Sequence, residues 1–201
     1  MGRKLVNAFL HPVLAFRYIG NELKKKLFLK KIIKDGAVCY KYGKEVYPEY
    51  LFQKKASSYI KDRALKYCRG KGIDIGAGAW PLEGAIPIEN VPEENAYKLD
   101  RFGDNSLDFV FSSHCLEHLK KWDKALLLWI QKLKPEGILF LYVPHESMRL
   151  WRPGEIFGMA HVWSPTWQVL APFLERAGME ILEYEKNKDR YWSFHIVAKK
   201  R

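Results

Sequence analysis

Short apolar runs alternate with amphipathic and irregular stretches along residues 71–201. Runs with the length and the β-branched or aromatic content of buried strands recur seven times. The predicted strands cover residues 71–75, 85–89, 96–100, 107–112, 138–143, 180–185 and 192–199. Because strands alternate with helical patterns, we expect a mostly parallel sheet with helices on both faces.

Two helical patterns lie between the later strands. The first runs from about residue 116 to residue 133, with a break near Lys120 and with Asp123 as N-cap after the break. The second begins at Ser164-Pro165, where a capping residue precedes proline, and ends at Gly178. Residues 144–163 have no regular period and are rich in tryptophan, proline and glycine, which indicates a loop or lid.

Residues 3–34 have a different pattern. Their apolar residues recur at three- and four-residue steps among many lysines, which predicts an amphipathic helix that Pro12 kinks or divides. A tyrosine-rich connector follows, and then a helix from Ser57 to Tyr67. We therefore predict a basic helical extension at residues 1–36, a connector and cap helix at 37–70, and the main domain at 71–201.

The positive charge is concentrated in the first third of the chain. Residues 1–70 hold 17 Lys and Arg against 5 Asp and Glu, a net charge of +12, whereas residues 71–201 hold 17 against 18. One interpretation places the basic helix on an anionic membrane surface, and another packs it on its own domain with its lysines in solvent. An RNA-binding arm is a third interpretation.

The composition narrows the cellular context. Cys39, Cys68 and Cys115 are odd in number and far apart, which argues against a disulfide framework or a cysteine-based zinc site and for a reducing compartment. No run approaches the 18 apolar residues of a spanning helix. Arg17 interrupts the N-terminal apolar stretch, so we expect no secretory signal. Val6 stands where a myristoylation signal has Ser or Thr.

A glycine turn follows the first predicted strand of the main domain. Asp74 lies within this strand, and Gly76-Ala77-Gly78 follows it. Glycine at such a turn permits positive φ values and lets the backbone approach a ligand closely. Ligands of parallel α/β sheets bind beyond the carboxyl ends of the strands, where this turn lies. Glu89 and Asp100, at the ends of the next two predicted strands, are expected at the same edge.

Several motifs in this order resemble the class I S-adenosylmethionine-dependent methyltransferases, in particular their small-molecule members. The resemblance extends across residues 71–185 and implies a three-layer Rossmann-like sheet of seven strands, the last antiparallel. It rests on the segments Asp74-Ile75-Gly76-Ala77-Gly78, Asn105-Ser106-Leu107-Asp108-Phe109-Val110, Ser113-His114-Cys115-Leu116-Glu117-His118-Leu119, Leu133-Lys134-Pro135-Glu136-Gly137-Ile138-Leu139 and Ala177-Gly178-Met179.

The resemblance implies that S-adenosylmethionine is the cofactor. Glu89 fits the acid that binds the ribose hydroxyls, Asp100 fits the acid that contacts the adenine, and Phe102 is a flat neighbour for that ring. Ser112 and His114 follow the fourth strand and would face the methionyl part. The expected cofactor-binding residues are therefore Asp74, Gly76, Ala77, Gly78, Glu89, Asp100, Phe102, Ser112 and His114.

The sequence departs from the family pattern behind the glycine turn. Trp80 replaces the third glycine, and Glu89 follows Gly76 sooner than the roughly 20 residues usual in dinucleotide folds. The first helix is therefore expected to shrink to a turn at residues 81–84, and the second to about residues 91–95. With this compact spacing, Asp100 is an alternative to Glu89 as the ribose acid.

Histidines supply the candidates for a catalytic base. Imidazole accepts a proton near neutral pH, and His145, His161 and His114 follow strands whose ends lie on the expected active-site side. His118 is interpreted as structural. The lid, with Trp151, Trp163, Trp167, Arg149 and Arg152, is expected to form a flat cationic pocket.

One rival motif overlaps these histidines. His114-Cys115-Leu116-Glu117-His118 has the His-x-x-Glu-His pattern of inverted zinc proteases. The pattern begins directly after a strand, and no third ligand is evident in a downstream helix, so we expect no metal site.

The sequence thus predicts a methyltransferase that acts on oxygen or nitrogen of a small molecule or a glycoconjugate precursor, including a lipid-linked saccharide. We expect it in the cytoplasm, with a peripheral position at the inner membrane face if the extension binds anionic lipid. Two alternatives stay open: an RNA methyltransferase that docks through the basic third, and a non-catalytic cofactor-binding module.

Overall fold

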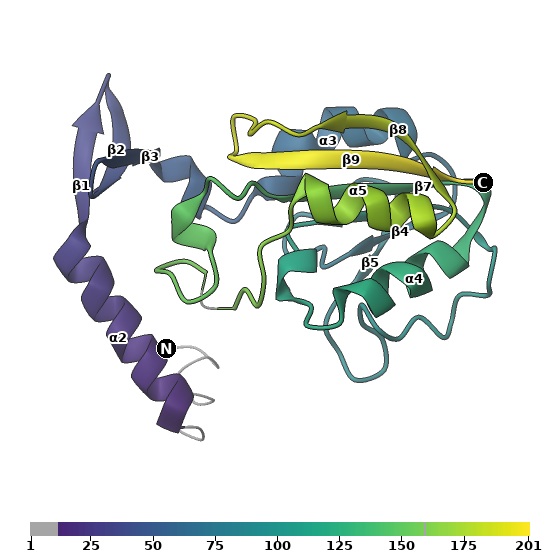
Figure 1. The fold of residues 1–201 in the computed structure, drawn as a ribbon, viewed down its shortest axis with the longest axis horizontal. Coiled ribbons are helices and arrows are strands. Elements are labelled where there is room, and N and C mark those ends of the chain that lie inside the picture. Colours follow the sequence, from purple (N-terminus) through teal and green to yellow (C-terminus); the bar gives the residue numbers. More distant parts are fainter. Residues whose placement is uncertain (1–11, 159) are drawn as a thin grey trace.

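The computed structural model describes residues 12–158 and 160–201. A six-stranded sheet in the order β5-β4-β6-β7-β9-β8 forms its centre (Figure 1). The strands are β4 (Gly72–Ile75), β5 (Ala85–Ile88), β6 (Leu107–Ser113), β7 (Leu133–Pro144), β8 (Met179–Glu185) and β9 (Ser193–Lys200). β4 pairs in parallel with β5 and β6, β6 pairs in parallel with β7, and β9 is antiparallel to both its neighbours. This confirms the predicted α/β class and the antiparallel last strand.

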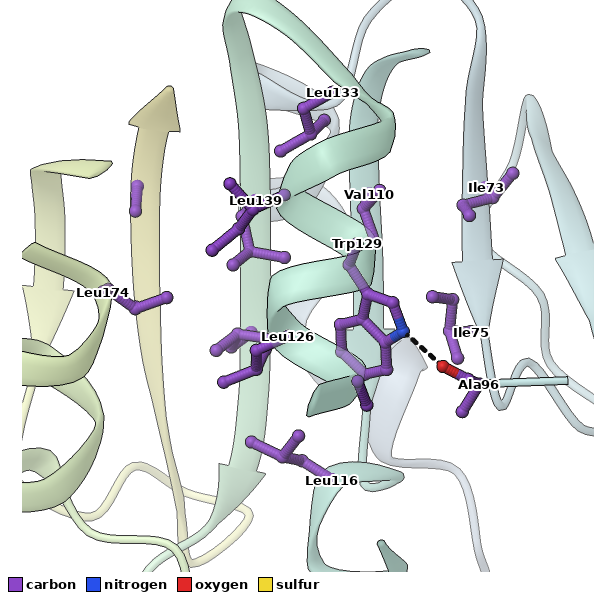
Figure 2. Packing of buried hydrophobic residues seen from close by; sticks show 14 of the residues in the cluster. Ile73, Ile75, Ala96, Val110, Leu116, Leu126, Trp129, Leu133, Leu139 and Leu174 are labelled. Carbon is purple, nitrogen blue, oxygen red and sulfur yellow. Dashed lines mark hydrogen bonds between the residues drawn. The ribbon is translucent and has the colours of Figure 1, made fainter. Parts of the chain in front are cut away.

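The strand predicted at residues 96–100 is not formed, so the sheet has six strands instead of seven. This segment makes only an isolated bridge between Asn95 and Lys98. Its Ala96 carbonyl accepts a hydrogen bond of 2.8 Å from the indole Nε1 of Trp129 (Figure 2). Ala96 and Leu99 are buried with Trp129 in one core cluster. The segment therefore packs under a helix instead of adding a strand to the sheet.

Helices cover both faces of the sheet, as predicted. α3 (Ala56–Tyr67) covers one face, and α4 (Trp122–Lys132) and α5 (Trp167–Arg176) cover the other. Alternating side chains of the strands divide between two cores, since successive residues of a strand point to opposite faces. Val110 and Leu139 belong to the core under α4, shown in Figure 2, whereas Phe111 and Phe140 pack toward α3.

Two helix starts differ from the prediction. The break near Lys120 is present, between the 3-10 turn η2 (Leu116–His118) and α4. Lys121 and not Asp123 holds the N-cap position, because the Lys121 carbonyl already accepts the bond from Ala125. α5 begins after Thr166 and not at Ser164-Pro165, since Thr166 is extended and accepts the first helical bond from Leu170.

The N-terminal extension contains a helix and a small sheet. α2 spans Pro12–Phe28, and the expectation for residues 3–11 lies outside the described residues. The helix predicted up to residue 34 ends at Phe28, and the predicted connector is mostly strand. β1 (Leu29–Lys34), β2 (Ala37–Tyr42) and β3 (Glu45–Pro48) form an antiparallel sheet.

A hairpin turn explains this difference. Asp35 and Gly36 connect β1 to β2, and both have positive φ, of 51° and 75°. Asp-Gly at such a two-residue loop is a strong hairpin signal, because the turn it favours matches the twist of the paired strands. The lysine-rich periodicity of residues 29–34 therefore belongs to an edge strand.

The extension projects to one side of the six-stranded sheet (Figure 1). The 3-10 turn η1 (Glu49–Phe52) connects it to α3. α2 contacts the lid, because Asn21 Nδ2 donates to the Glu155 carbonyl at 3.3 Å and Lys25 Nζ lies 5.2 Å from the centre of the Phe157 ring. Its apolar side chains at Ile19, Leu23, Leu27 and Phe28 are exposed. Among the described helices, none is long and apolar enough to span a bilayer.

Candidate active site

The glycine turn lies at the carboxyl end of β4, as predicted. Gly76 donates its N–H to the Ile88 carbonyl at 2.9 Å, which fixes the turn to the end of β5. Gly76 and Gly78 have φ of 78° and 57°. A Cβ atom on Gly76 would lie 2.6 Å from the Cβ atom of Cys115, whereas one on Gly78 would meet no described atom within 4 Å. The turn therefore leaves open space on its Gly78 side, which suits a ligand.

Two carboxylates flank this turn. Glu89 directly follows β5, and its Oε1 accepts the N–H of Gly78 at 2.7 Å, while the side chain stays exposed. Asp74 is fully buried within β4. Its Oδ2 accepts the N–H of Leu82 at 2.8 Å, and its Oδ1 has no hydrogen-bond partner among the described residues. Glu89 and the glycines thus form one surface, with the Asp74 carboxyl behind it.

Burial raises the pKa of Asp74 to about 7. The hydrogen bond from Leu82 opposes this rise, and the nearby negative charge of Glu89 adds to it. A cationic ligand group near the turn would favour the ionised form of Asp74.

The other predicted cofactor residues lie in different surroundings. Asp100 is exposed in the turn after Leu99. Phe102 is buried in the core, with the Arg101 guanidinium 4.8 Å from its ring centre. Ser112 is buried at the end of β6, where its hydroxyl donates to the Ile75 carbonyl at 3.0 Å and ties β6 to β4. Ala77 is buried within the turn. Their predicted contacts with the cofactor stay predictions.

The segment behind the turn is compact, as the sequence spacing predicted. β4 and β5 are joined by turns, and no described residue between them is helical. Trp80, in the place of the family's third glycine, is exposed, and Lys55 Nζ lies 5.1 Å from its ring centre.

Three histidines surround the carboxylate of Glu117 beyond the end of β6. Glu117 Oε1 lies 3.7 Å from His114 Nδ1, 4.0 Å from His118 Nε2 and 3.8 Å from His161 Nε2. The Glu117 side chain is fully buried, and neither of its oxygens has a hydrogen-bond partner in the described part of the chain. The lid therefore brings His161 against the segment that contains the other three residues. We call these four residues the Glu117 cluster.

Burial keeps the groups of the Glu117 cluster neutral. It raises the pKa of Glu117 to about 8 and lowers the pKa of His161 to about 4. The pKa of His114 falls to about 3, first through burial and then through repulsion by the other two histidines, and burial also lowers the pKa of His118. His114 has a φ of 50°, a strained value for a side chain of this size that is typical of functional positions.

His145 and His161 line a small pocket under the lid. Its other lining residues are Pro144, Glu146, Met148, Trp151, Arg152, Trp163, Ser164 and Pro165. Trp151, Trp163 and Arg152 of the predicted cationic pocket are thus brought together, around a space of about 10 Å³ that matches one water molecule. Arg149 and Trp167 do not line it, because Arg149 lies over the Tyr42 ring and Trp167 stacks on Tyr184.

A hydrogen bond assigns the tautomer of His145. Its Nδ1 accepts the backbone N–H of Ser147 at 3.1 Å. In the neutral ring, Nε2 therefore carries the hydrogen and is a donor.

A second hollow borders the Glu117 cluster at His118. His118 lines it together with Tyr97, Lys120, Lys121, Lys124, Leu128 and Val162. The three lysines give this hollow a positive charge that suits an anionic group.

Neither Glu117 nor Ser193 was predicted to have a role in the site. Glu117 was visible only as part of the His-x-x-Glu-His pattern. Ser193 lies 2.8 Å from His114 Nε2, and no sequence motif marked it.

Comparison with known proteins agrees with this geometry. The family model described as a methyltransferase domain matches residues 59–141. None of the curated proteins compared with the chain matches its sequence significantly.

Solved structures share the fold at low sequence identity. An S-adenosylmethionine-dependent methyltransferase of Thermotoga maritima, described as a possible histamine N-methyltransferase, is 14% identical, with 76% of this chain and 92% of that one covered and a TM-score of 0.55. The 1,6-didemethyltoxoflavin-N1-methyltransferase of Burkholderia thailandensis, with bound 1,6-didemethyltoxoflavin and S-adenosylhomocysteine, is 16% identical, with 86% and 99% covered and a TM-score of 0.55. A methyltransferase of Archaeoglobus fulgidus is 18% identical, with 75% and 99% covered and a TM-score of 0.53.

Proposed function

Because this chain is a class I S-adenosylmethionine-dependent methyltransferase, we propose that it methylates an oxygen or nitrogen of a small molecule or a glycoconjugate precursor. The observation that carries the proposal is the lid pocket, where aromatic rings, Arg152 and two histidines meet beyond the ends of β6 and β7. Aromatic rings suit the flat faces of sugars or heterocycles, and arginine suits phosphate or carboxylate.

The residues at the glycine turn fit the cofactor. Gly76 and Gly78 let the backbone approach it, Glu89 offers a carboxylate to the ribose hydroxyls, and the unpaired Oδ1 of Asp74 adds a buried acceptor. When bound, the cofactor supplies a methyl group on a sulfonium, whose C–S bond breaks as the acceptor atom bonds to carbon and whose electron pair stays on sulfur.

The acceptor needs orientation and a route for its proton. His161 is neutral near pH 7, so it is able to accept a proton from a hydroxyl or ammonium in the lid pocket. His145 presents an Nε2–H group, which suits it to orient the acceptor by donating a hydrogen bond. The lysine-lined hollow beside His118 fits a phosphate of the same substrate, as in a nucleotide sugar or a lipid-linked saccharide.

A transfer assay with methyl-labelled cofactor tests this proposal. The acceptors are nucleotide sugars, lipid-linked saccharides, heterocyclic amines and short RNA. We expect label in a saccharide or small-molecule fraction, with kcat lowered at least about 100-fold in His161→Ala. Leu182→Ala, on the edge strand β8, is the control that should keep full activity. Label in RNA alone would favour the RNA methyltransferase, and cofactor binding without any transfer would favour the binding module.

We also propose that α2 holds the enzyme at an anionic membrane surface. Ile19, Leu23 and Leu27 are spaced by one helical turn and are exposed. Three lysines, at positions 24–26, lie between Leu23 and Leu27. This combination suits a helix that lies in the membrane interface. A lipid-linked acceptor would be reached from this position.

Vesicle sedimentation tests the membrane proposal with point variants. Removal of residues 1–36 would delete β1 and expose the edge of β2, so Leu23→Glu with Leu27→Glu is the cleaner change. We expect the wild type to sediment with phosphatidylglycerol vesicles and the double variant to stay in solution. Leu127→Glu, exposed on α4, is the matched control. Equal sedimentation of the wild type and the double variant would rule the proposal out.

A further inference from the structure

The hydrogen bonds of two histidines in the Glu117 cluster direct their lone pairs inward. His118 Nδ1 lies 2.9 Å from the Ala160 carbonyl, which only accepts, so Nδ1 carries the hydrogen and Nε2 is left free. The Ser193 hydroxyl donates to the Tyr191 carbonyl at 3.2 Å, so His114 Nε2 must donate to Ser193 and leave Nδ1 free. The two free nitrogens are those nearest to Glu117 Oε1.

Such an arrangement is typical of metal-binding histidines. A ligating imidazole usually donates its far N–H to a protein oxygen, which fixes the tautomer and the ring orientation. His118 and His114 have these outer partners in Ala160 and Ser193. The Glu117 carboxyl receives no hydrogen bond from any described residue, so its oxygens are free to coordinate a cation.

We propose that Glu117, His118 and His161 form a binding site for a divalent transition-metal cation of the Zn²⁺ class, with the free Nδ1 of His114 beside these three ligands but outside their set. The donor atoms of the first three residues lie within 4.8 Å of one another. Two histidines and one glutamate are the protein ligands of a known class of catalytic zinc site, in which a fourth position stays open. Imidazole donors also disfavour Mg²⁺, which prefers oxygen.

The distances in the cluster favour a shared cation over direct hydrogen bonds. The separations of 3.7–4.0 Å between Glu117 Oε1 and the three nitrogens exceed those of hydrogen bonds. Two ligand atoms on one tetrahedral Zn²⁺ lie about 3.4 Å apart, so the separations between Glu117 and the histidines would contract by a few tenths of an ångström, while all three donor atoms already lie within 4.8 Å of one another.

The proposed site borders both hollows. His161 lines the lid pocket and His118 lines the lysine-rich hollow, so an open coordination position would be accessible to a substrate oxygen. A coordinated hydroxyl loses its proton to water more readily, which would prepare it for methyl transfer. This role rests on the proposed function, and it would make His161 a ligand and not the base. The binding site itself does not depend on the substrate.

The position of the third ligand in the chain explains why no metal site was predicted from the sequence. The His-x-x-Glu-His pattern was discounted because no downstream helix offered a further ligand. His161 comes from the irregular lid instead, and η2 is a 3-10 turn that leaves His114 outside it.

Metal titration of the full chain tests the proposal. The chain is stripped with a chelator and titrated by calorimetry with Zn²⁺, Co²⁺ and Mg²⁺. We expect one Zn²⁺ per chain, visible d–d absorption with Co²⁺, and no binding of Mg²⁺. Glu117→Gln and His118→Ala should each weaken Zn²⁺ binding at least tenfold. His145→Ala removes a histidine of the lid pocket outside the cluster and should bind Zn²⁺ like the wild type.

Binding of S-adenosylhomocysteine to the same preparations shows that each variant is folded. Absence of Zn²⁺ binding in a wild type that binds S-adenosylhomocysteine would overturn the metal site and leave the methyltransferase unaffected. Equal Zn²⁺ binding by the wild type and Glu117→Gln would also overturn it. Normal Zn²⁺ binding without methyl transfer to any acceptor would instead count against the proposed function.

Discussion

Gly76 combines a positive φ with a close contact, so substitution there should affect both stability and cofactor binding. We expect Gly76→Ala to weaken S-adenosylhomocysteine binding at least tenfold, because a Cβ atom would lie 2.6 Å from Cys115 and displace the turn. Gly84 has a similar φ of 80° but would meet no described atom within 4 Å. Gly84→Ala should therefore cost only about 1 kcal/mol of backbone strain and leave binding intact, as calorimetry and urea unfolding would show.

The buried Asp74 carboxyl predicts a pH dependence of stability. Its pKa is raised to about 7 in the folded chain, so the folded state holds this proton more tightly than the unfolded state does. The contribution of this tighter proton binding to the free energy of unfolding is fully present below about pH 4 and is lost as the pH rises through 7. Thermal unfolding from pH 5 to 9 should show a smaller loss in Asp74→Asn than in the wild type.

The pKa of Asp108 is shifted in the opposite direction to that of Asp74. Hydrogen bonds from Lys134 and from the Lys71 N–H lower its pKa. Its contribution is therefore present above the ordinary pKa of about 4 and is lost at more acid pH. Asp108→Asn should destabilise the protein at pH 7 and have less effect near pH 3.

Identical pH profiles for Asp74→Asn and the wild type would contradict the assigned pKa shift of Asp74.

At the level of elements, the three-stranded sheet is joined to the main core through β3. Tyr47 is fully buried there, and its ring centre lies 5.1 Å from that of Trp192. We expect Tyr47→Ala to lower the free energy of unfolding by about 3–5 kcal/mol, because it leaves a large cavity in this core. Ile33→Ala, on the exposed face of β1, should change it by less than about 0.5 kcal/mol in the same urea titration.

Two elements show where local pattern misleads. Residues 29–34 have helical periodicity, yet the Asp35-Gly36 turn pairs them with β2. Residues 96–100 have the composition of a strand, yet the Ala96 carbonyl is bonded to Trp129 on α4. In both segments, hydrogen bonds to another part of the chain outweigh a weak local preference for helix or strand. Only the Asp35-Gly36 turn could have been recognised from the sequence.

At the level of the whole molecule, ligand binding should stabilise the folded domain around the six-stranded sheet. S-adenosylhomocysteine at 100 times its Kd adds about 2.7 kcal/mol to the free energy of unfolding. For a chain of this size we expect a rise in Tm of about 5–11 °C, measured by differential scanning calorimetry. Glu89→Ala should reduce this rise at the same ligand concentration, because it removes the exposed carboxylate at the turn. An unchanged rise would exclude Glu89 from the site.

The strands, their parallel arrangement and the glycine turn were predictable from the amino-acid sequence, because burial imposes a short-range period and Gly76 marks a backbone conformation that few other residues adopt. The Glu117 cluster was not predictable from the sequence. His161 meets Glu117 only because the irregular lid folds back over the end of β6, and Ser193 orients His114 from a different strand. No local period encodes such contacts between distant segments. The glycine turn could thus be predicted from the sequence, whereas the grouping of donor atoms in the Glu117 cluster depends on tertiary packing.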